Sequence, residues 1–308
     1  MPTLEKSVTE GAMSLTLGLG VGWVGSFLEH CVAGNPLIQR LQNIYSVLSL
    51  ARTGARLRDK MLLFCIVGFG VLAFHRTTAR KVLFSLVSRF AQDELVTVRF
   101  NKHDRQLVFL LRQDNEADYS VAAEMLKGGY EWPNFTPGEI IDGGANIGLF
   151  SILAAASFPH AKLICYEPDA DNFELLSRNL DINNIDAECH RKGLWSRDTT
   201  LYYRARDSHT GNISENPEGR VPVDCIRPVI GPNCWLKLDI ESSEYVVLPA
   251  LMKAGAYPRW ISIEIHNYSK DGHKLTDLLA RHGYVLRGNV HASADESTLC
   301  AFRTHGGA

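Results

Sequence analysis

Hydrophobic and polar positions along residues 94–303 predict short strands that alternate with helices. Runs rich in β-branched and aromatic residues predict strands at residues 95–100, 106–111, 139–142, 162–166, 187–190, 221–226, 234–240, 260–266, 284–286 and 298–303. Apolar residues at helical spacing predict helices at residues 118–125, 148–157, 172–180, 244–252 and 273–282. The first two strands form an expected hairpin, and the last two can pair antiparallel. The alternation elsewhere predicts a mostly parallel sheet with helices on both faces, and a ligand site beyond the carboxyl ends of its strands.

Two segments of this region are candidates for contact with a substrate. Residues 197–220 form a long polar stretch, and loops of this length in a compact domain tend to be functional or disordered. Its residues His209, Thr210 and Asn212 are expected at the edge where a substrate enters. Glu131, between Tyr130 and Trp132, precedes the strand at residues 139–142, where these residues form either a lid or acceptor wall, or ordinary packing.

The first third of the chain has a different pattern, which divides the protein into residues 1–93 and residues 94–308. Residues 11–28 carry no charge but contain five glycines, and residues 61–74 form a second uncharged run. Residues 82–90 continue as an amphipathic helix. We interpret this N-terminal extension as helical and as membrane-associated, with one marginal span or two helices lying in the interface. The alternative is a pair of helices packed on the C-terminal domain or on a second subunit.

Charge is distributed unevenly between the two parts. Residues 1–90 hold ten Lys and Arg against four Asp and Glu, whereas the whole chain of 308 residues has a net charge of −2. A basic, apolar segment in front of an acidic body argues for contact with anionic lipid through residues 11–90 and against nucleic acid as a partner. This combination favours a cytoplasmic protein at the cytoplasmic face of a membrane. The seven cysteines form no C-x-x-C pair, so we expect buried, reduced thiols and no zinc site.

A glycine-rich stretch follows the strand expected at residues 139–142. The sequence Asp142-Gly143-Gly144-Ala-Asn146-Ile-Gly148 leads from that strand into a helix. Such a turn can bring backbone N–H groups and the positive end of a helix towards a ligand. Its spacing is not the G-x-G-x-x-G of nicotinamide- and flavin-binding folds, which disfavours an oxidoreductase.

A second acidic residue accompanies this stretch. Glu167 ends the strand at residues 162–166 and lies 19 residues beyond Gly148. A carboxylate at this place can accept both ribose hydroxyls of an adenosyl group. Together with Asp142 it favours S-adenosylmethionine (SAM), whose sulfonium and ammonium suit an acidic cleft and whose carboxylate suits backbone N–H donors. Asn146 either shapes the turn or touches the methionyl end.

Charged residues also alternate with apolar ones in the strand expected at residues 234–240. Lys237, Asp239 and Glu241 either form an ion pair between Lys237 and Asp239 that holds the strand end, or place Asp239 and Glu241 beside the reacting group. His266, at the end of a later strand, is the alternative base. Asp239, Glu241 and Glu264 leave Mg²⁺ as an open but disfavoured alternative.

Three blocks of this sequence resemble the FkbM family of methyltransferases. They are Ile141-Asp-Gly-Gly-Ala-Asn-Ile-Gly148, Tyr166-Glu-Pro-Asp169 with Asn172, and Leu236-Lys-Leu-Asp-Ile-Glu-Ser-Ser-Glu244. The resemblance covers about residues 94–305. Family members usually carry glycine where this chain has Ser242. If the backbone there needs a positive φ, serine costs about 1 kcal/mol.

The resemblance implies a Rossmann-like class I methyltransferase fold, with a mostly parallel seven-stranded sheet and an antiparallel last strand. It also implies a SAM-dependent methyltransferase that methylates a hydroxyl oxygen on a sugar, a glycolipid or another small metabolite; a lipid-linked glycan is one such acceptor. The alternative is a non-catalytic SAM-binding scaffold at a membrane. The expected cofactor-binding residues are Asp142, Gly143, Gly144, Asn146, Gly148, Glu167 and Asp239, and the candidate catalytic residues are Asp239, Glu241, Lys237 and His266.

Overall fold

A computed structural model describes residues 53–54, 59–60, 95–102, 104–113, 115–127, 130–205, 211–218, 220–231, 233–288 and 296–303. The helices expected at residues 11–28, 61–74 and 82–90 lie outside these ranges, as do His209 and Thr210. Among the described helices, none is both long and apolar enough to cross a membrane. The five cysteines in the described ranges are all free, as predicted.

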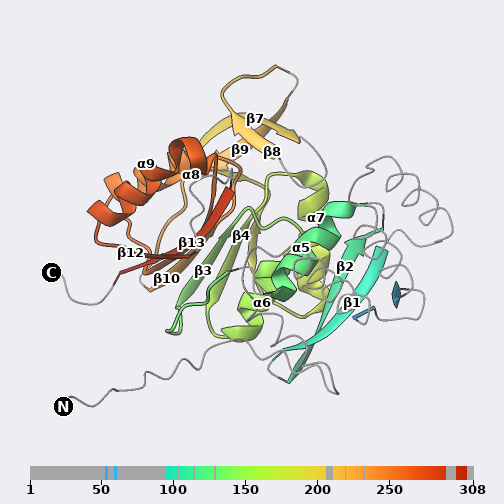
Figure 1. The fold of residues 1–308 in the computed structure, drawn as a ribbon. Helices are drawn as coiled ribbons and strands as arrows, with labels where there is room; N and C mark the ends of the chain where they lie inside the picture. The colour runs from blue at the N-terminus through green and yellow to red at the C-terminus, as the bar shows by residue number, and fades with distance from the viewer. Residues whose placement is uncertain are drawn as a thin grey trace, which may run out of the picture.

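A seven-stranded sheet forms the centre of the fold, in the order β12-β13-β11-β10-β3-β4-β5 (Figure 1). Neighbouring strands from β5 to β11 pair in parallel, whereas β13 is antiparallel to both β11 and β12. The predicted mostly parallel sheet with an antiparallel last strand is therefore confirmed. The strands are β3 (Glu139–Gly143), β4 (Lys162–Tyr166), β5 (Glu188–His190), β10 (Cys234–Leu238), β11 (Trp260–His266), β12 (Val285–Gly288) and β13 (Glu296–Phe302).

Helices cover both faces of this sheet (Figure 1). Successive side chains of a strand point to opposite faces, so Ile140 packs into one hydrophobic core and Ile141 into another. Asp169 caps α7 by accepting hydrogen bonds from the N–H groups of Asp171 and Asn172. The helices are α5 (Glu116–Lys127), α6 (Leu149–Ser157) and α7 (Ala170–Ile182) on one side, and α8 (Glu244–Lys253) and α9 (Tyr268–Arg281) on the other.

The predicted hairpin is formed by β1 (Leu95–Lys102) and β2 (Arg105–Arg112), and it packs against α6 and α7. The side-chain amide of Asn179 on α7 accepts from the N–H of Leu110 at 2.7 Å and donates to its carbonyl at 3.1 Å. The same amide donates to the carbonyl of Ile147 at 2.9 Å. One buried side chain thus satisfies backbone groups of both the hairpin and the glycine-rich loop.

The expectation of an irregular loop over residues 197–220 is wrong. The segment contains two strands of a four-stranded sheet with the order β6-β9-β7-β8. Leu201 and Tyr203 face a small core, while the other face of the sheet is open to solvent. Only a few residues of these strands alternate between apolar and polar, and many polar residues surround them, so the strands are hard to recognise from the sequence. The strands are β6 (Gly193–Leu194), β7 (Thr199–Ala205), β8 (Gly211–Ser214) and β9 (Val221–Ile226).

Candidate active site

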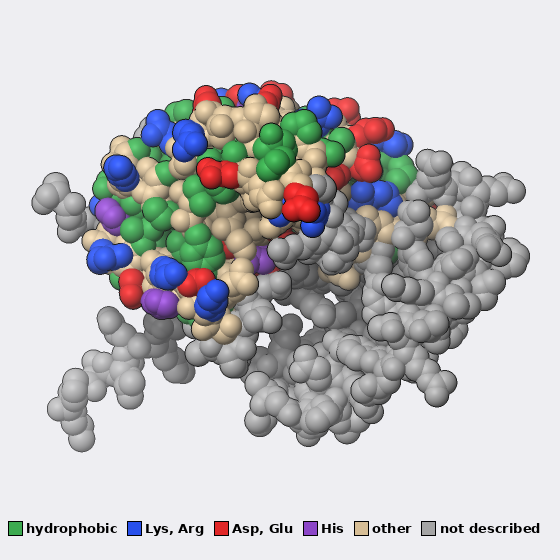
Figure 2. Space-filling view, turned by 90° about the horizontal axis from the view of Figure 1, so that it is seen from above, with side chains coloured by type: hydrophobic (Ala, Val, Ile, Leu, Met, Phe, Trp, Pro, Cys, Tyr) green, Lys and Arg blue, Asp and Glu red, His purple; other side chains and the backbone are tan. Residues whose placement is uncertain are grey.

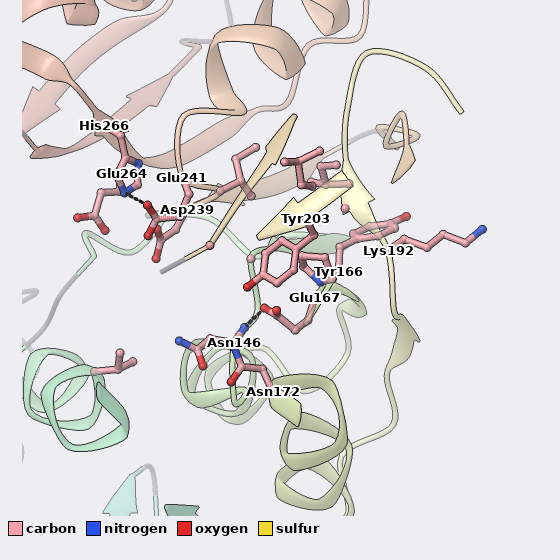
Figure 3. A pocket seen from close by; sticks show the side chains of 18 of the residues that line it. Asn146, Tyr166, Glu167, Asn172, Lys192, Tyr203, Asp239, Glu241, Glu264 and His266 are labelled. Atoms are coloured by element: carbon pink, nitrogen blue, oxygen red, sulfur yellow. Dashed lines mark hydrogen bonds and ion pairs between the residues drawn. The ribbon is translucent and has the colours of Figure 1, made fainter. Parts of the chain in front are cut away.

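A cavity of about 320 Å³ lies beyond the carboxyl ends of β3, β4, β10 and β11, and the small sheet covers part of it. Asn146 and Glu167 line one end, close to Tyr166 and Asn172 (Figure 3). Asp239, Glu241, Glu264 and His266 line the other end (Figure 3). A cavity therefore lies where the sequence predicted the ligand site, since parallel strands leave a crevice at this edge.

Glycines let the loop after β3 pass close to β10. Gly144 has φ +73°, and a Cβ there would lie 1.8 Å from the carbonyl oxygen of Asp239. Gly148 has φ +88°, and its Cβ would lie 2.7 Å from a methyl group of Leu176. Both positions favour glycine because their φ is positive and a side chain would collide with a neighbour; Gly144 lines the cavity, whereas Gly148 precedes the first residue of α6.

The backbone N–H groups of this loop do not have the partners that the sequence suggested. Those of Gly144 and Ala145 both donate to the carbonyl of Tyr166 at 3.0 Å. That of Asn146 donates to Oε2 of Glu167 at 2.7 Å. These three N–H groups therefore already have acceptors within the protein, Tyr166 and Glu167, whereas the sequence suggested a ligand as their partner.

Asp142 and Lys237 lie below the cavity instead of lining it. The Asp142 carboxylate is fully buried, accepts a hydrogen bond from Ser151 Oγ, and lies 3.2 Å from Lys237 Nζ. Lys237 Nζ also donates to the carbonyl of Gly144 at 2.7 Å and lies 3.7 Å from Asp239 Oδ2. Burial lowers the pKa of Lys237, but the carboxylates of Asp142 and Asp239 outweigh burial and raise it overall. Lys237 and Asp142 thus hold the glycine-rich loop onto β10. Gly143, also predicted to bind the cofactor, is the last residue of β3.

Glu167 and Asn146 present acceptors to the cavity. Glu167 accepts from the N–H groups of Asn146 at 2.7 Å and of Asp169 at 2.9 Å. Burial outweighs these two contacts and raises the pKa of Glu167 to about 7. The side-chain oxygen of Asn146 is buried and has no hydrogen-bond partner within the described ranges. A polar atom left in this state at a cavity wall suits a ligand that donates a hydrogen bond.

The opposite end of the cavity is acidic. Asp239 Oδ2 accepts a hydrogen bond from Tyr130 Oη at 3.3 Å, and Glu241 Oε2 lies 3.5 Å from His266 Nε2. Burial lowers the pKa of His266, but Glu244 and Glu241 outweigh burial and raise the pKa to about 9. Within the described ranges, no three His, Cys, Asp or Glu residues are grouped so that they could hold a metal ion.

The backbone at Ser242 has a positive φ, as the glycine usually found at this position in FkbM family members suggested. Its φ is +77°, and that of Glu241 is +53°.

Replacing Ser242 by glycine should raise the free energy of unfolding by about 0.5–1 kcal/mol, because glycine relieves the left-handed strain but loses more chain entropy on folding. Urea denaturation would measure this change. Ser243 has an ordinary helical φ of −71°, so Ser243→Gly should destabilise the protein; a stabilisation of the same size there would contradict the explanation.

Sequence reasoning missed the cavity residues that the small sheet contributes. Tyr203, Gly211 and Ile213 line the cavity from β7 and β8. Asn212, a predicted contact, instead accepts a hydrogen bond from Arg220 Nη1 at 3.1 Å. The signal that could have revealed these residues is the alternation of Leu201 and Tyr203 with polar neighbours, which is typical of a strand.

No protein-family model matches the chain. The chain is 25% identical over 143 residues to Methyltransferase 1 of Beauveria bassiana, in an alignment covering 36% of this chain and 57% of the relative. It is 47% identical over 81 residues to Methyltransferase sdnD of Sordaria araneosa, covering 26% of this chain and 31% of the relative. Each matched segment therefore resembles part of a protein named as a methyltransferase. It spans little more than half of the first relative and about a third of the second.

Two solved structures are distantly similar. The methyltransferase FkbM of Methylobacillus flagellatus KT has 16% sequence identity and a TM-score of 0.40, over 86% of this chain and 60% of its own. A Pyrococcus abyssi tRNA (uracil-54, C5)-methyltransferase has 16% identity and a TM-score of 0.41, over 68% of this chain and 44% of its own.

Proposed function

We propose that this protein is a SAM-dependent methyltransferase. The observation that supports the proposal most directly is the presence of Glu167 and Asn146 on one wall of the cavity. The Glu167 carboxylate suits the two ribose hydroxyls of an adenosyl group, and the unpartnered oxygen of Asn146 suits an ammonium group. Bound SAM supplies a methyl group carried on a sulfonium. The cavity of about 320 Å³ is within the usual range for small-molecule sites.

The proposed acceptor is a hydroxyl group of a sugar, a glycolipid or another small metabolite. The carboxylates of Asp239, Glu241 and Glu264 can accept hydrogen bonds from several hydroxyl groups at once. Methyl transfer is an in-line displacement, so holding the acceptor oxygen in line accounts for much of the catalysis. Figure 2 shows basic and acidic side chains interspersed on the face in view, whereas a nucleic-acid acceptor calls for a basic patch. Contact of residues 11–90 with a membrane stays a prediction.

Calorimetric titration of the full chain with SAM and with S-adenosylhomocysteine tests the proposal. We expect both to bind, and we expect label from methyl-labelled SAM to appear in at least one hydroxylated acceptor from a panel of sugars, glycolipids and polyketides. If neither compound binds, the enzyme and the SAM-binding scaffold are both excluded. Binding without transfer to any acceptor would favour the scaffold.

The affinity for SAM should depend on pH through Glu167, whose pKa of about 7 lies above its ordinary value of 4.5. Because ribose hydroxyls donate to the ionised carboxylate, the affinity should rise as the pH rises through this pKa. We expect Kd to fall about tenfold between about pH 6 and about pH 8. The same shift acts on folding in the opposite sense: the fold favours the protonated acid, so its stabilising contribution is lost as the pH rises from 4.5 to about 7.

Titrations at a series of pH values would measure this dependence. Glu167→Gln removes the ionisable group while keeping the shape of the side chain, so its Kd should lose this tenfold change. A wild-type Kd that is constant over the same range would contradict the role given to Glu167.

A further inference from the structure

His266 lies between two carboxylates at the acidic end of the cavity. Its ring Nδ1 is 3.2 Å from Glu244 Oε1, and its Nε2 is 3.5 Å from Glu241 Oε2 (Figure 3 shows the Glu241 contact). His266 and Glu241 line the cavity, whereas the Glu244 side chain is 0% exposed. The histidine therefore has a buried carboxylate behind it and the cavity in front of it.

The carboxylate of Glu244 contacts both the backbone and the ring of His266. Its Oε1 accepts the backbone N–H of His266 at 2.9 Å as well as the ring contact. Its Oε2 is buried and has no hydrogen-bond partner in the part of the chain that the structure describes. Because Oε1 already accepts the backbone N–H, the ring meets it as a second donor, so Nδ1 carries a proton. A buried carboxylate needs a compensating charge or donor, and the imidazole supplies both.

The first turn of α8 fixes the end of β11 at two points. Glu244 begins the helix and bonds the N–H and the ring of His266, while the Oη of the next residue, Tyr245, donates to the carbonyl of His266 at 2.8 Å. The backbone and the ring of one residue are thus held by two consecutive side chains. This arrangement sets the direction in which Nε2 points.

Other acidic residues belong to the elements that adjoin His266. Asp239 and Glu241 come from the loop after β10, Glu264 lies two residues earlier on β11 and lines the same cavity, and β13 places Glu296 opposite His266 in the strand register. Glu244, Glu241 and Asp239 outweigh burial, which is why the pKa of His266 is raised to about 9. The resting histidine is therefore cationic at neutral pH and becomes neutral as the pH approaches this value.

On the basis of the proposed function, we propose that Glu244 is a positioning residue for His266. It holds the Nδ1–H and directs Nε2 into the cavity, where neutral Nε2 takes the proton of the acceptor hydroxyl. The acceptor oxygen keeps the electron pair of the broken O–H bond and forms its bond to the methyl carbon, while the electron pair of the methyl–sulfur bond stays on sulfur. The imidazolium that results is balanced by the buried Glu244 carboxylate, the arrangement that a carboxylate–histidine pair uses elsewhere.

The first test follows the His266 ring by NMR in the full chain, without any substrate. The wild-type pKa is expected near 9. Glu244→Gln keeps the shape and an acceptor oxygen but removes the charge, so the pKa of His266 should fall below about 8. Glu244→Asp keeps the charge and should restore part of the shift. Glu174→Gln removes an equal charge from an exposed position on α7 and should leave the pKa unchanged.

The second test measures the pH dependence of kcat. The wild-type rate should rise with pH to a plateau above about 9, and Glu244→Gln should move this inflection to lower pH together with the NMR pKa. His266→Gln should lower kcat by about 10²–10⁴-fold with little change in the Kd for SAM. A His266 pKa that is the same in Glu244→Gln and wild type would overturn the positioning role whether or not the protein methylates anything. A His266→Gln variant with full kcat would overturn the role of His266 as the proton acceptor. Failure of SAM to bind would overturn the proposed function, but the NMR test of Glu244 would still give its answer.

Discussion

Replacing Glu167 by alanine is expected to weaken the binding of SAM by about 100-fold, because two hydrogen bonds to a charged acceptor are lost at about 1.5 kcal/mol each. Glu167 is only 4% exposed and lines the cavity, so its carboxylate can bond a ligand with little competition from water. The loss also removes the acceptor for the N–H groups of Asn146 and Asp169, which fix the adjoining loops. Calorimetry on the purified variant measures the change directly.

Two further variants separate the causes of this loss. Glu167→Gln keeps an oxygen for the backbone N–H groups, so it should weaken binding by about tenfold through loss of charge alone. Glu174→Ala removes a glutamate from the exposed side of α7 and should leave Kd unchanged. If Glu167→Ala binds SAM within threefold of wild type while its circular dichroism is native, the adenosyl group does not bind at the end of β4.

Replacing Lys237 by methionine should lower the free energy of unfolding by about 3–5 kcal/mol. The lysine is 3% exposed and bonds the carbonyl of Gly144, and it faces the fully buried carboxylate of Asp142. Methionine fills most of the space but leaves that carboxylate without its cation. Chemical denaturation, followed by tryptophan fluorescence, would measure the loss.

A double variant is the control for this prediction. Asp142→Asn removes the carboxylate that Lys237→Met leaves unpaired, so the double variant should lose clearly less stability than the sum of the two single variants. The asparagine side chain can still pair with Ser151 Oγ. A loss below about 1 kcal/mol in Lys237→Met would contradict the stabilising role given to the Asp142–Lys237 pair.

The sequence predicted the sheet because its strands are strongly apolar and its turns are specific. Ile140 and Ile141 are both fully buried, as a central parallel strand requires, and Asp169 is the kind of residue that caps a helix N-terminus, as it does at α7. The need for a positive φ at Ser242 could also be predicted, since glycine in related sequences is a statement about backbone geometry. Strands β7 and β8 of the small sheet escaped prediction because one face of that sheet meets solvent, whereas β9 was predicted as a strand at residues 221–226.

The roles within the site were harder to predict than its location. Asp142, Asp239 and Glu167 all end parallel strands, but only the last two line the cavity. Sequence spacing cannot tell which of these acids lines the cavity, because the difference depends on a partner from another strand. Asp142 is buried below the cavity, where it pairs with Lys237. The direction of the loop amides likewise depends on the carbonyl of Tyr166, which is distant in sequence.

The register between β3 and β10 gives the Asp142–Lys237 pair a second consequence. The two residues are direct partners across these neighbouring strands. A shift of either strand by one residue would turn that strand's charged side chain towards the opposite face and separate it from its partner within the core. Flanking residues such as Ile140, Ile141, Leu236 and Leu238 are all apolar and would tolerate such a shift far better. The pair therefore fixes the register of β3 against β10 in the middle of the sheet. The apolar residues alone would allow several registers during folding, and the charged pair selects one of them.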